Sequence, residues 1–469
     1  MAPDPSPTGA GTTTTQAATT AAAPSPRTPR RTFFRRLLFV VGLVSLAYVL
    51  GAAVMFFQLP SSEALRKAFL GARAWLSSKT LPHQPPPVFA PQVDKPDKTY
   101  DGFTLLSVVS RYELSTRAYL IDMRGQIVHT WTIRFSEVWS DPPHIKRGLV
   151  EDNLVCTFAC HLYPNGDLLA VFHGMDKSAT GFGLVKLDKD SDVVWKYAAR
   201  THHDVDVGED GTIYAIQHKN IDTRPEGLAP IPAPWLVDYL VMLSPETGQP
   251  LREPIPILDA ILESPYAPLL THLEPPRVPA PDAELTLKSQ DALRMKQDVT
   301  HTNSVHVLSR KLAPKFPGFK AGQVLLSLRT PSALVVLDPD RGKVVWAARG
   351  PWKAQHDARF LDTGRILLFD NQGSPRSSRV LEYDPQTQAL PWVYPGAGGF
   401  PFYSGERGMS QRLPNGNTLI VSSEKGQLLE VTRGGELVWS FSSDGFIPTG
   451  RRYGPGELHF LKGGQRARP

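Results

Sequence analysis

Cysteine is almost absent from this sequence, which limits the cofactors and cross-links that it could hold. Only Cys156 and Cys160 occur among 469 residues, and His161 follows directly. The C-x-x-x-C-H spacing differs from the C-x-x-C-H of haem attachment, and no second Cys/His cluster completes a zinc site. Two buried small residues and one local disulfide in an oxidising compartment are both compatible with the pattern. We expect no cofactor and no metal.

The sequence also lacks a large excess of charge of one sign. It has 51 Lys and Arg against 45 Asp and Glu, a net charge of +6. Most of the excess comes from arginines that precede the first apolar run: Arg27, Arg30, Arg31, Arg35 and Arg36. We therefore expect no nucleic-acid partner for the folded part of the chain.

Long hydrophobic runs are scarce, and the exception lies at residues 37–57, which carry no charge. As a helix this run is roughly 30 Å long, the thickness of the hydrocarbon core of a bilayer. A cleavable signal peptide is the alternative, but its apolar region would be shorter and would end at a small-residue cleavage site. The run predicts a single transmembrane helix over 37–59. The preceding arginines predict a cytoplasmic N-terminus and a periplasmic or extracellular remainder.

The rest of the chain divides by composition. Residues 1–36 are of low complexity and basic, and we expect them to be disordered. Residues 60–99 predict a juxtamembrane amphipathic helix over 62–79 followed by a Pro-rich linker. A folded domain is expected over 100–445, with a C-terminal tail at 446–469.

Long helical patterns are missing from that domain, whereas 44 Pro and 37 Gly punctuate the chain between short apolar runs. A hairpin pattern occurs six times, as an apolar strand, an Asp/Pro/Gly turn and a second strand that often ends in Trp. The copies span 118–131, 183–197, 240–251, 333–346, 379–392 and 427–439. Another strand pattern precedes each copy, and insertions lie at 252–298 and 311–320. Six such units predict an all-β, six-bladed β-propeller.

The inner strands of a propeller begin around one channel, so residues at their starts converge. His203 and His356 each lie eight residues before a turn glycine, His301 and Asn303 begin another predicted inner strand, and Arg329 ends the next strand. Histidine, amide and guanidinium groups together make a cationic pocket, rich in donors, that suits a tetrahedral oxyanion.

His356 has the context expected of a nucleophile. Asp357 or a backbone carbonyl could hold one ring nitrogen protonated, which leaves the other free to attack.

Several phrases, from about residue 100 to residue 453, resemble the bacterial arylsulfate sulfotransferase family in sequence and in order. They are G-F-T-L (102–105), Y-L-I-D-M-R-G-Q-I-V-H-T-W (119–131), H-H-D-V (202–205), H-T-N-S-V (301–305), S-L-R (327–329), Q-H-D-A (355–358), L-L-F-D-N (367–371), Q-R-L-P-N-G-N-T-L-I (411–420) and R-R-Y (451–453). The resemblance implies a six-bladed propeller that moves a sulfuryl group from a phenolic sulfate donor to a phenol acceptor. It implies a sulfohistidine intermediate and no nucleotide sulfate donor.

Carried onto this sequence, the resemblance makes His356 the nucleophile. Arg329, His301 and Asn303 would bind and polarise the sulfuryl oxygens. His203 would be the acid/base partner of the phenolic oxygen, with His202 as a competing candidate; the spacing to the turn glycine favours His203.

Two other functions are compatible with the pattern. One is a membrane-tethered, non-catalytic propeller that acts as a binding scaffold. The other is a different propeller enzyme, such as a quinone-cofactor dehydrogenase or a lactonase, because the hairpins LDPDRGKVVW and LSPETGQPL are of a kind that many propellers share. The sequence does not predict an oligomeric state.

Overall fold

The structure is a computed structural model that divides into two compact units, Met1–Phe69 and Leu70–Pro469. The described residues are 29–56, 90–109, 117–139, 142–144, 152, 155–174, 181–222, 235–270, 297–374, 377–395 and 399–461. The predicted helix at 62–79 and residues 1–28 lie outside them.

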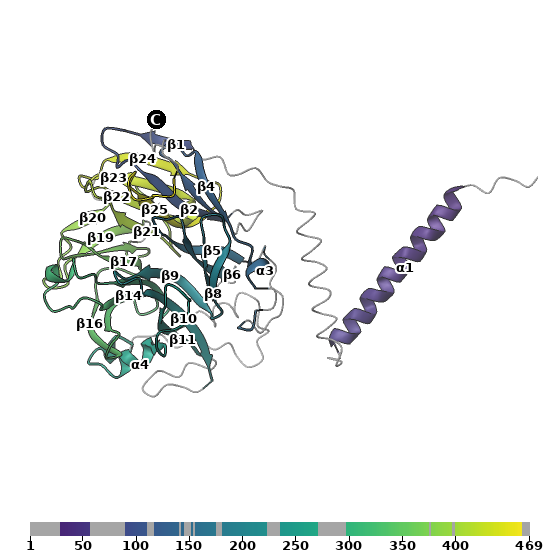
Figure 1. Ribbon diagram of the computed structural model, residues 1–469, viewed down its shortest axis with the longest axis horizontal. Helices are drawn as coiled ribbons and strands as arrows, with labels where there is room; N and C mark the ends of the chain where they lie inside the picture. The colour runs from purple at the N-terminus through teal and green to yellow at the C-terminus, as the bar shows by residue number, and fades with distance from the viewer. Residues whose placement is uncertain are drawn as a thin grey trace, which may run out of the picture. The chain divides into compact units, whose positions relative to one another are not determined.

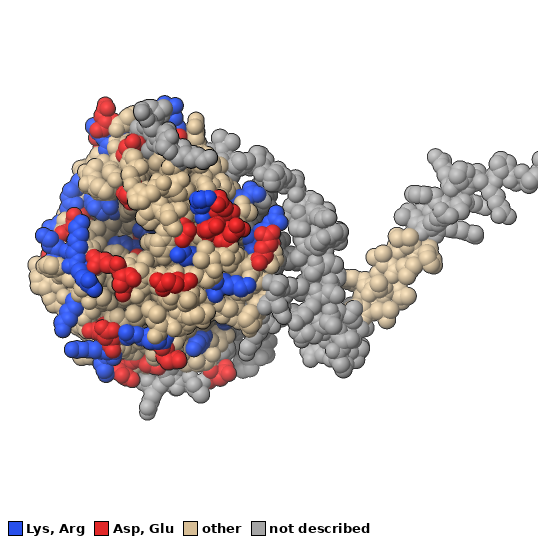
Figure 2. All heavy atoms as spheres, in the orientation of Figure 1, with Lys and Arg blue, Asp and Glu red and all other residues tan. Residues whose placement is uncertain are grey.

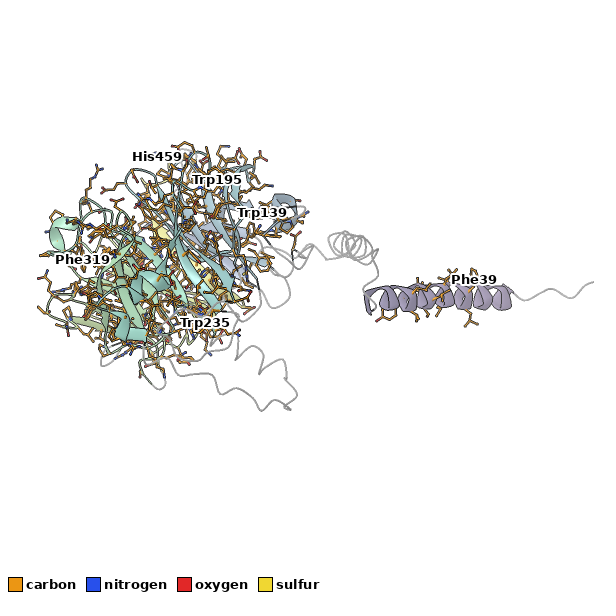
Figure 3. All side chains as sticks on the ribbon, turned by 90° about the horizontal axis from the view of Figure 1, so that it is seen from below. Phe39, Trp139, Trp195, Trp235, Phe319 and His459 are labelled. Carbon is orange, nitrogen blue, oxygen red and sulfur yellow. The ribbon has the colours of Figure 1, made fainter. Side chains whose placement is uncertain are left out.

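In the first unit, the helix α1 covers Pro29–Phe56. Its described apolar side chains are exposed, and Phe39, labelled in Figure 3, is 69% exposed. Across the residues that the structure describes, no helix combines the length and the apolar character needed to cross a membrane. The transmembrane segment therefore stays a prediction.

The second unit confirms the six-bladed propeller. Six antiparallel sheets each have one edge strand at the centre, and these inner strands contact one another in a ring (Figure 1). From inner to outer strand, the first blade is β25 (Phe446–Tyr453), β2 (Phe103–Val109), β3 (Arg117–Ile121) and β4 (Ile127–Thr132), and the second is β5 (Val155–Leu162), β6 (Leu168–Gly174), β7 (Gly181–Leu187) and β8 (Val193–Tyr197). The third blade is β9 (Thr201–Val207), β10 (Ile213–Ile221), β11 (Trp235–Leu243) and β12 (Ile255–Pro256), and the fourth is β13 (Thr302–Val307), β14 (Val324–Leu328), β15 (Ala333–Asp338) and β16 (Lys343–Arg349). The fifth blade is β17 (His356–Phe360), β18 (Ile366–Asp370), β19 (Arg379–Tyr383) and β20 (Trp392–Tyr394), and the sixth is β21 (Met409–Arg412), β22 (Thr418–Ser422), β23 (Gln427–Val431), β24 (Leu437–Ser442) and β1 (Ala90–Asp94).

Short helices lie in the connections between strands. They are α3 (Phe135–Val138), α4 (Ile257–Leu262) and the 3₁₀ turns η2 (Ala267–Leu270), η3 (Ala313–Lys315) and η4 (Ser423–Lys425). The 252–298 insertion thus contributes β12, α4 and η2, while its stretch 271–296 lies outside the described residues.

Both predicted boundaries of the propeller domain are wrong. The expected C-terminal tail contains β25, which is the innermost strand of the first sheet and pairs with β2. The expected linker contains β1, which adds a fifth strand beside β24. Pairing the two ends of the chain in this way closes the ring and satisfies backbone groups that an open edge would expose. It also makes residues 103–109 the second strand of their blade.

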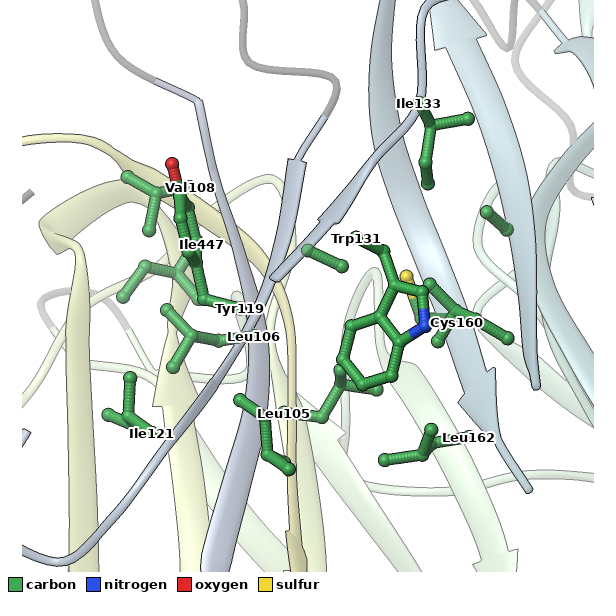
Figure 4. Close-up of a cluster of buried hydrophobic side chains, with 14 of the residues drawn as sticks. Leu105, Leu106, Val108, Tyr119, Ile121, Trp131, Ile133, Cys160, Leu162 and Ile447 are labelled. Atoms are coloured by element: carbon green, nitrogen blue, oxygen red, sulfur yellow. The ribbon is translucent and has the colours of Figure 1, made fainter. Parts of the chain in front are cut away.

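The blades pack through large apolar side chains, as Figure 4 shows around Trp131. Trp131 is fully buried, and its indole N–H donates to the Gly166 carbonyl at 3.1 Å. Cys160 lies in the same cluster. Cys156 and Cys160 are buried free thiols on β5, and burial raises the pKa of Cys156 to about 12. Four residues of strand span about 13 Å, too far for a disulfide, so the local-disulfide alternative does not hold.

Candidate active site

The inner strands are irregular where they reach the channel. β5, β9, β13 and β17 each have a β-bulge there, at residues 158, 203–204, 303 and 357–358. His203 and Asp357 have φ angles of +59° and +50°, and His301, just before β13, has φ +44°. For residues other than glycine this conformation costs about 1–3 kcal/mol each, and it concentrates at functional sites. Bulges re-aim side chains, and here they turn polar ones toward the axis.

His356 is the first residue of β17 and is 2% exposed. Its Nδ1 lies 2.7 Å from Asn371 Oδ1 and 3.1 Å from the Ala354 carbonyl oxygen. The Asn371 amide nitrogen donates to the Ser404 carbonyl, so its oxygen must face the histidine. Nδ1 therefore carries the proton, and Nε2 keeps its lone pair.

The backbone carbonyl was one of the two predicted partners of His356; the other, Asp357, does not contact the ring. Asp357 instead accepts from Arg359 Nε at 2.7 Å and from the Ser410 backbone N–H. The same guanidinium bonds Asp204 at 2.6 Å. Arg359 thus links the aspartates of both His-Asp pairs and joins β17 to β9, the inner strands on either side of β13. We name Asp204, Asp357 and Arg359 the ion-paired belt.

Burial, followed by the nearby guanidinium groups of Arg329 and Arg407, holds the pKa of His356 well below its ordinary value. The pKa of His203 is also lowered well below its ordinary value, by burial first and then by the neighbouring histidines and Arg407. Both rings are therefore neutral at neutral pH. Neutral imidazole is the nucleophilic form, and each further positive charge nearby disfavours protonation.

His203, and not His202, faces the channel. Its ring centroid lies 6.4 Å from that of His356 and 5.0 Å from that of His301. His202 points outward along its blade, where its Nε2 lies 3.2 Å from Asp238 Oδ1. The two neighbours still touch, since their Nδ1 atoms lie 2.7 Å apart. The position in the channel favours His203 over His202 as the acid/base candidate, as the spacing to the turn glycine also does.

His301 and Asn303 occupy the start of β13. His301 Nδ1 lies 2.7 Å from Asp298 Oδ2, which orients the ring and leaves Nε2 for a ligand. The Asn303 amide nitrogen donates to the Gln355 carbonyl at 2.7 Å, and one of its two hydrogens is used there. Asn303 Oδ1 is buried and has no hydrogen-bond partner among the described residues. Asn303 therefore offers the site an acceptor as well as a donor.

Arg329 follows β14, and its backbone N–H donates to the His301 carbonyl at 3.1 Å. No carboxylate of the described residues lies within ion-pair distance of its guanidinium. Burial lowers its pKa, and more distant carboxylates oppose that shift. Arg329 is half-buried, and a guanidinium that has no carboxylate partner among the described residues is suited to an anionic ligand.

Arg407 is a site residue that the sequence interpretation missed. It lies two residues before β21 and is 5% exposed. Its guanidinium stacks 3.8 Å over the Phe158 ring and donates to the backbone carbonyls of Pro448, Phe158 and His203. Within the described ranges no carboxylate pairs with it, and burial lowers its pKa to about 10. Its place before an inner strand, equivalent to that of His301, was the available signal.

His203, Asn303, His356 and Arg407 line one small pocket of about 10 Å³ together with Asp204, Asp357, Gly408 and Met409. We name it the central pocket. His301 borders it through His203, and Arg329 acts on it electrostatically. A larger hollow of about 250 Å³ lies elsewhere, around Phe319 and Trp346, and its lining has no titratable group. Acidic and basic residues are interspersed on the face drawn in Figure 2, so buried residues give the pocket its cationic character.

The axis of this propeller carries His203, His301 and His356 together with Arg329 and Arg407, and neither arginine has a carboxylate partner among the described residues. Such a group of side chains is suited to an oxyanion. The sequence matches the family model described as Arylsulfotransferase (ASST) over residues 160–444, more than half of the chain. The chain belongs to the arylsulfotransferase family, which confirms the resemblance found in its motifs. No curated protein matches the sequence.

Several solved structures are similar to this chain at low sequence identity. A protein of unknown function from Bacteroides caccae shares 12% identity, with a TM-score of 0.46 over 75% of this chain and 98% of that chain. Virginiamycin B lyase from Staphylococcus aureus shares 9%, with a TM-score of 0.33 over 60% and 69%. Quinohemoprotein alcohol dehydrogenase from Comamonas testosteroni shares 12%, with a TM-score of 0.37 over 75% and 67%. Similarity this low supports no argument about activity.

Proposed function

We propose that this protein transfers a sulfuryl group from an aryl sulfate ester to a phenol through a sulfohistidine formed on His356. The main support is the environment of the His356 ring, which is buried and neutral and whose Nδ1 is held by Asn371 and Ala354. It shares the central pocket with the guanidinium of Arg407, which lacks a carboxylate partner among the described residues. No nucleotide sulfate donor is required, because the aryl ester itself carries the group.

In the first step, the sulfuryl oxygens bind where buried cations lack counter-ions. Arg329 and Arg407 supply charge, and the free Asn303 N–H supplies a hydrogen-bond donor. His301, beside His203, also contacts the sulfuryl oxygens. His356 Nε2 then bonds to sulfur while the S–O bond to the phenol breaks, and its electron pair leaves on the phenoxide oxygen. Donors fixed before the reaction stabilise this charge without reorganisation. The Asn371 oxygen on Nδ1–H stabilises the positive charge that the His356 ring gains.

In this mechanism His203 exchanges protons with the phenolic oxygens. A ring of low pKa is unprotonated at rest, so it takes the proton of the incoming phenol more readily than it gives one. The bound anionic sulfuryl group raises the pKa of nearby histidines, so His203 takes up a proton from solvent when the donor binds and passes it to the leaving phenoxide. The second phenol attacks sulfur as the S–N bond breaks and returns its electron pair to Nε2. Ping-pong kinetics follow.

We also propose that residues 37–59 anchor the propeller in a membrane, with the N-terminus in the cytoplasm. The uncharged run, its helical conformation within α1 and the arginines before it support this topology. Protease added to spheroplasts should degrade the propeller. If residues 100–453 stay protected while a periplasmic control is cleaved, the orientation is wrong.

The activity is tested by incubating the purified full-length chain with 4-nitrophenyl sulfate and a phenol acceptor. We expect nitrophenolate release that depends on the acceptor, together with a sulfated acceptor product. Steady release without acceptor would indicate a hydrolase instead. No release with any aryl sulfate, from a folded protein, would favour the alternative of a non-catalytic, membrane-tethered scaffold.

A further inference from the structure

A second group of buried polar side chains lies in the third blade, outside the central pocket. His202, His218 and Asp238 come from the three adjacent strands β9, β10 and β11, which Figure 1 shows side by side. They are 0%, 2% and 0% exposed. One ligand atom from each lies within 4.8 Å of the others. We name this group the outer cluster.

The strand register explains why these residues meet. His218 is directly opposite Asp238 across β10 and β11. His202 is opposite Ile216, two residues before His218, and therefore on the same face of the sheet. Cross-strand and diagonal neighbours on one face are within reach of each other. Residues that are well separated in sequence are thus brought to one point by ordinary antiparallel pairing.

His218 is the unexplained member of the outer cluster. Neither ring nitrogen has a hydrogen-bond partner among the described residues, although the ring is buried. An unsatisfied buried polar group costs about 1–3 kcal/mol. A ring nitrogen of His218 is left within 4.8 Å of the ligand atoms of the other two residues, without a bonding partner among the described residues.

The other two members are oriented by contacts outside the cluster. Asp238 Oδ2 accepts from the Thr300 hydroxyl and the Thr302 backbone N–H, both at 2.7 Å, which leaves Oδ1 toward the cluster. His202 Nε2 lies 3.2 Å from that Oδ1, close to the separation of two ligands on one tetrahedral ion. The opposite nitrogen of His202 contacts His203 at 2.7 Å. Ligating histidines typically donate their other N–H in this way.

We propose that His202, His218 and Asp238 form a binding site for a divalent transition-metal cation, with Zn²⁺ as the best fit. Two imidazoles and one carboxylate match the ligands that zinc takes, and they leave one position open for water. Nitrogen ligands disfavour Mg²⁺ and Ca²⁺, which prefer oxygen. The site departs from our sequence-based expectation of no metal, and it does not depend on sulfuryl transfer.

The test measures metal content directly. A tag-free, full-length chain is purified, dialysed against metal-free buffer and analysed by mass spectrometry for metals, before and after incubation with Zn²⁺. We expect about one Zn²⁺ per chain. Replacement by Co²⁺ should give a visible absorption spectrum typical of a four-coordinate site. A wild-type chain that takes up neither ion overturns the proposal, and water would then satisfy His218.

Variants locate the ion. His218→Phe should lose the metal, while His306→Phe, a matched change at a histidine on β13, should keep it. Asp238→Asn should weaken binding by about 10-fold or more and serves if His218→Phe does not fold. Circular dichroism checks folding in each case. A folded His218→Phe chain that retains the metal, or equal metal loss in His306→Phe, would contradict the assignment.

Discussion

Arg359 and Arg407 are both buried guanidinium groups near the axis of the propeller, and their surroundings are opposite. Arg359 contacts Asp204 at 2.6 Å and Asp357 at 2.7 Å, and these carboxylates raise its pKa despite burial. Arg407 has carbonyl partners and an aromatic ring, and burial lowers its pKa to about 10. One arginine is neutralised by the protein. The other is left with positive charge that a ligand can neutralise.

The comparison separates what holds the blades together from what recognises an anion. Arg359 connects β9, β13 and β17, since it also donates to the Val305 carbonyl at 2.8 Å. Arg407 faces the pocket that contains His356. A buried charge without a partner is costly, and a protein usually retains one only where it has a function. We therefore assign a structural role to the ion pairs of the belt, and we propose that the arginines without a carboxylate partner among the described residues bind the anionic ligand.

The largest expected effect is on the pocket side, at His356. His356→Ala should abolish sulfuryl transfer, because no other described residue combines a free imidazole nitrogen with a place beside these arginines and an orienting amide. Binding of an aryl sulfate should survive, since Arg329 and Arg407 are unchanged. Turnover of 4-nitrophenyl sulfate measures the loss of transfer, and equilibrium binding of the same ester measures whether substrate binding survives. A variant that turns over at the wild-type rate would remove His356 from the chemistry.

Removing each of the two arginines in turn sharpens the comparison most directly. Arg359→Met removes the closest cation from two buried carboxylates and should destabilise folding by about 3–5 kcal/mol. Arg407→Met removes an unneutralised charge and should leave stability almost unchanged, or raise it, while transfer falls by about 10²–10³. Urea unfolding and initial rates measure both. If Arg407→Met unfolds and Arg359→Met does not, the proposed difference in role between the two arginines is wrong.

As the pH is lowered, the buried histidines should reduce the stability of the fold at a higher pH than the carboxylates of the ion-paired belt do. Burial lowers the pKa of His173 to about 3, and of His161 and His306 to about 4, from an ordinary 6.5. Below 6.5 the unfolded chain binds protons that the folded one refuses, so stability falls as the pH falls toward 4 and is unaffected above 6.5.

Each such histidine should cost about 2 kcal/mol between pH 6.5 and roughly pH 5. The free energy of unfolding at several pH values measures this, and His173→Phe should flatten the slope. A stability that is constant from about pH 7.5 to pH 5 would contradict the neutral state of these rings.

A smaller effect is expected where charge is kept and geometry is lost. Arg329→Lys retains a cation but not the planar fork that bonds two oxygens at once, and it should cost about 10-fold in kcat/KM. The matched control is Arg365→Lys, because Arg365 forms an ion pair with Glu382 at 3.1 Å away from the central pocket. That control should keep the wild-type kcat/KM. Equal losses in both variants would show that Arg329 has no special part.

The repeat and the inner-strand rule predicted much of the fold and most of the candidate site. Hairpin periodicity predicted six blades, and the position of histidines before strands predicted that His203 and His356 would share a pocket. Arg407 also precedes an inner strand, but it was not among the predicted site residues. The role of Asn371 cannot be predicted from its motif, since only the tertiary structure brings it to 2.7 Å from His356.

Other features could not be predicted because they depend on long-range pairing. Nothing local distinguishes β25 from a tail, since its partner β2 lies at the other end of the propeller sequence. The left-handed backbone of His203 and Asp357 is imposed by bulges against local preference. The outer cluster arises from strand register, and its residues form no local metal-binding motif.

The most direct test of the central claim is the site of covalent sulfuryl attachment. The full-length protein is mixed with 4-nitrophenyl sulfate in the absence of acceptor, quenched, digested and analysed by mass spectrometry. We predict a sulfuryl adduct on His356 that disappears when a phenol is added before quenching. An adduct on another residue of an active enzyme, or acceptor-dependent turnover without any adduct on His356, would contradict the proposal.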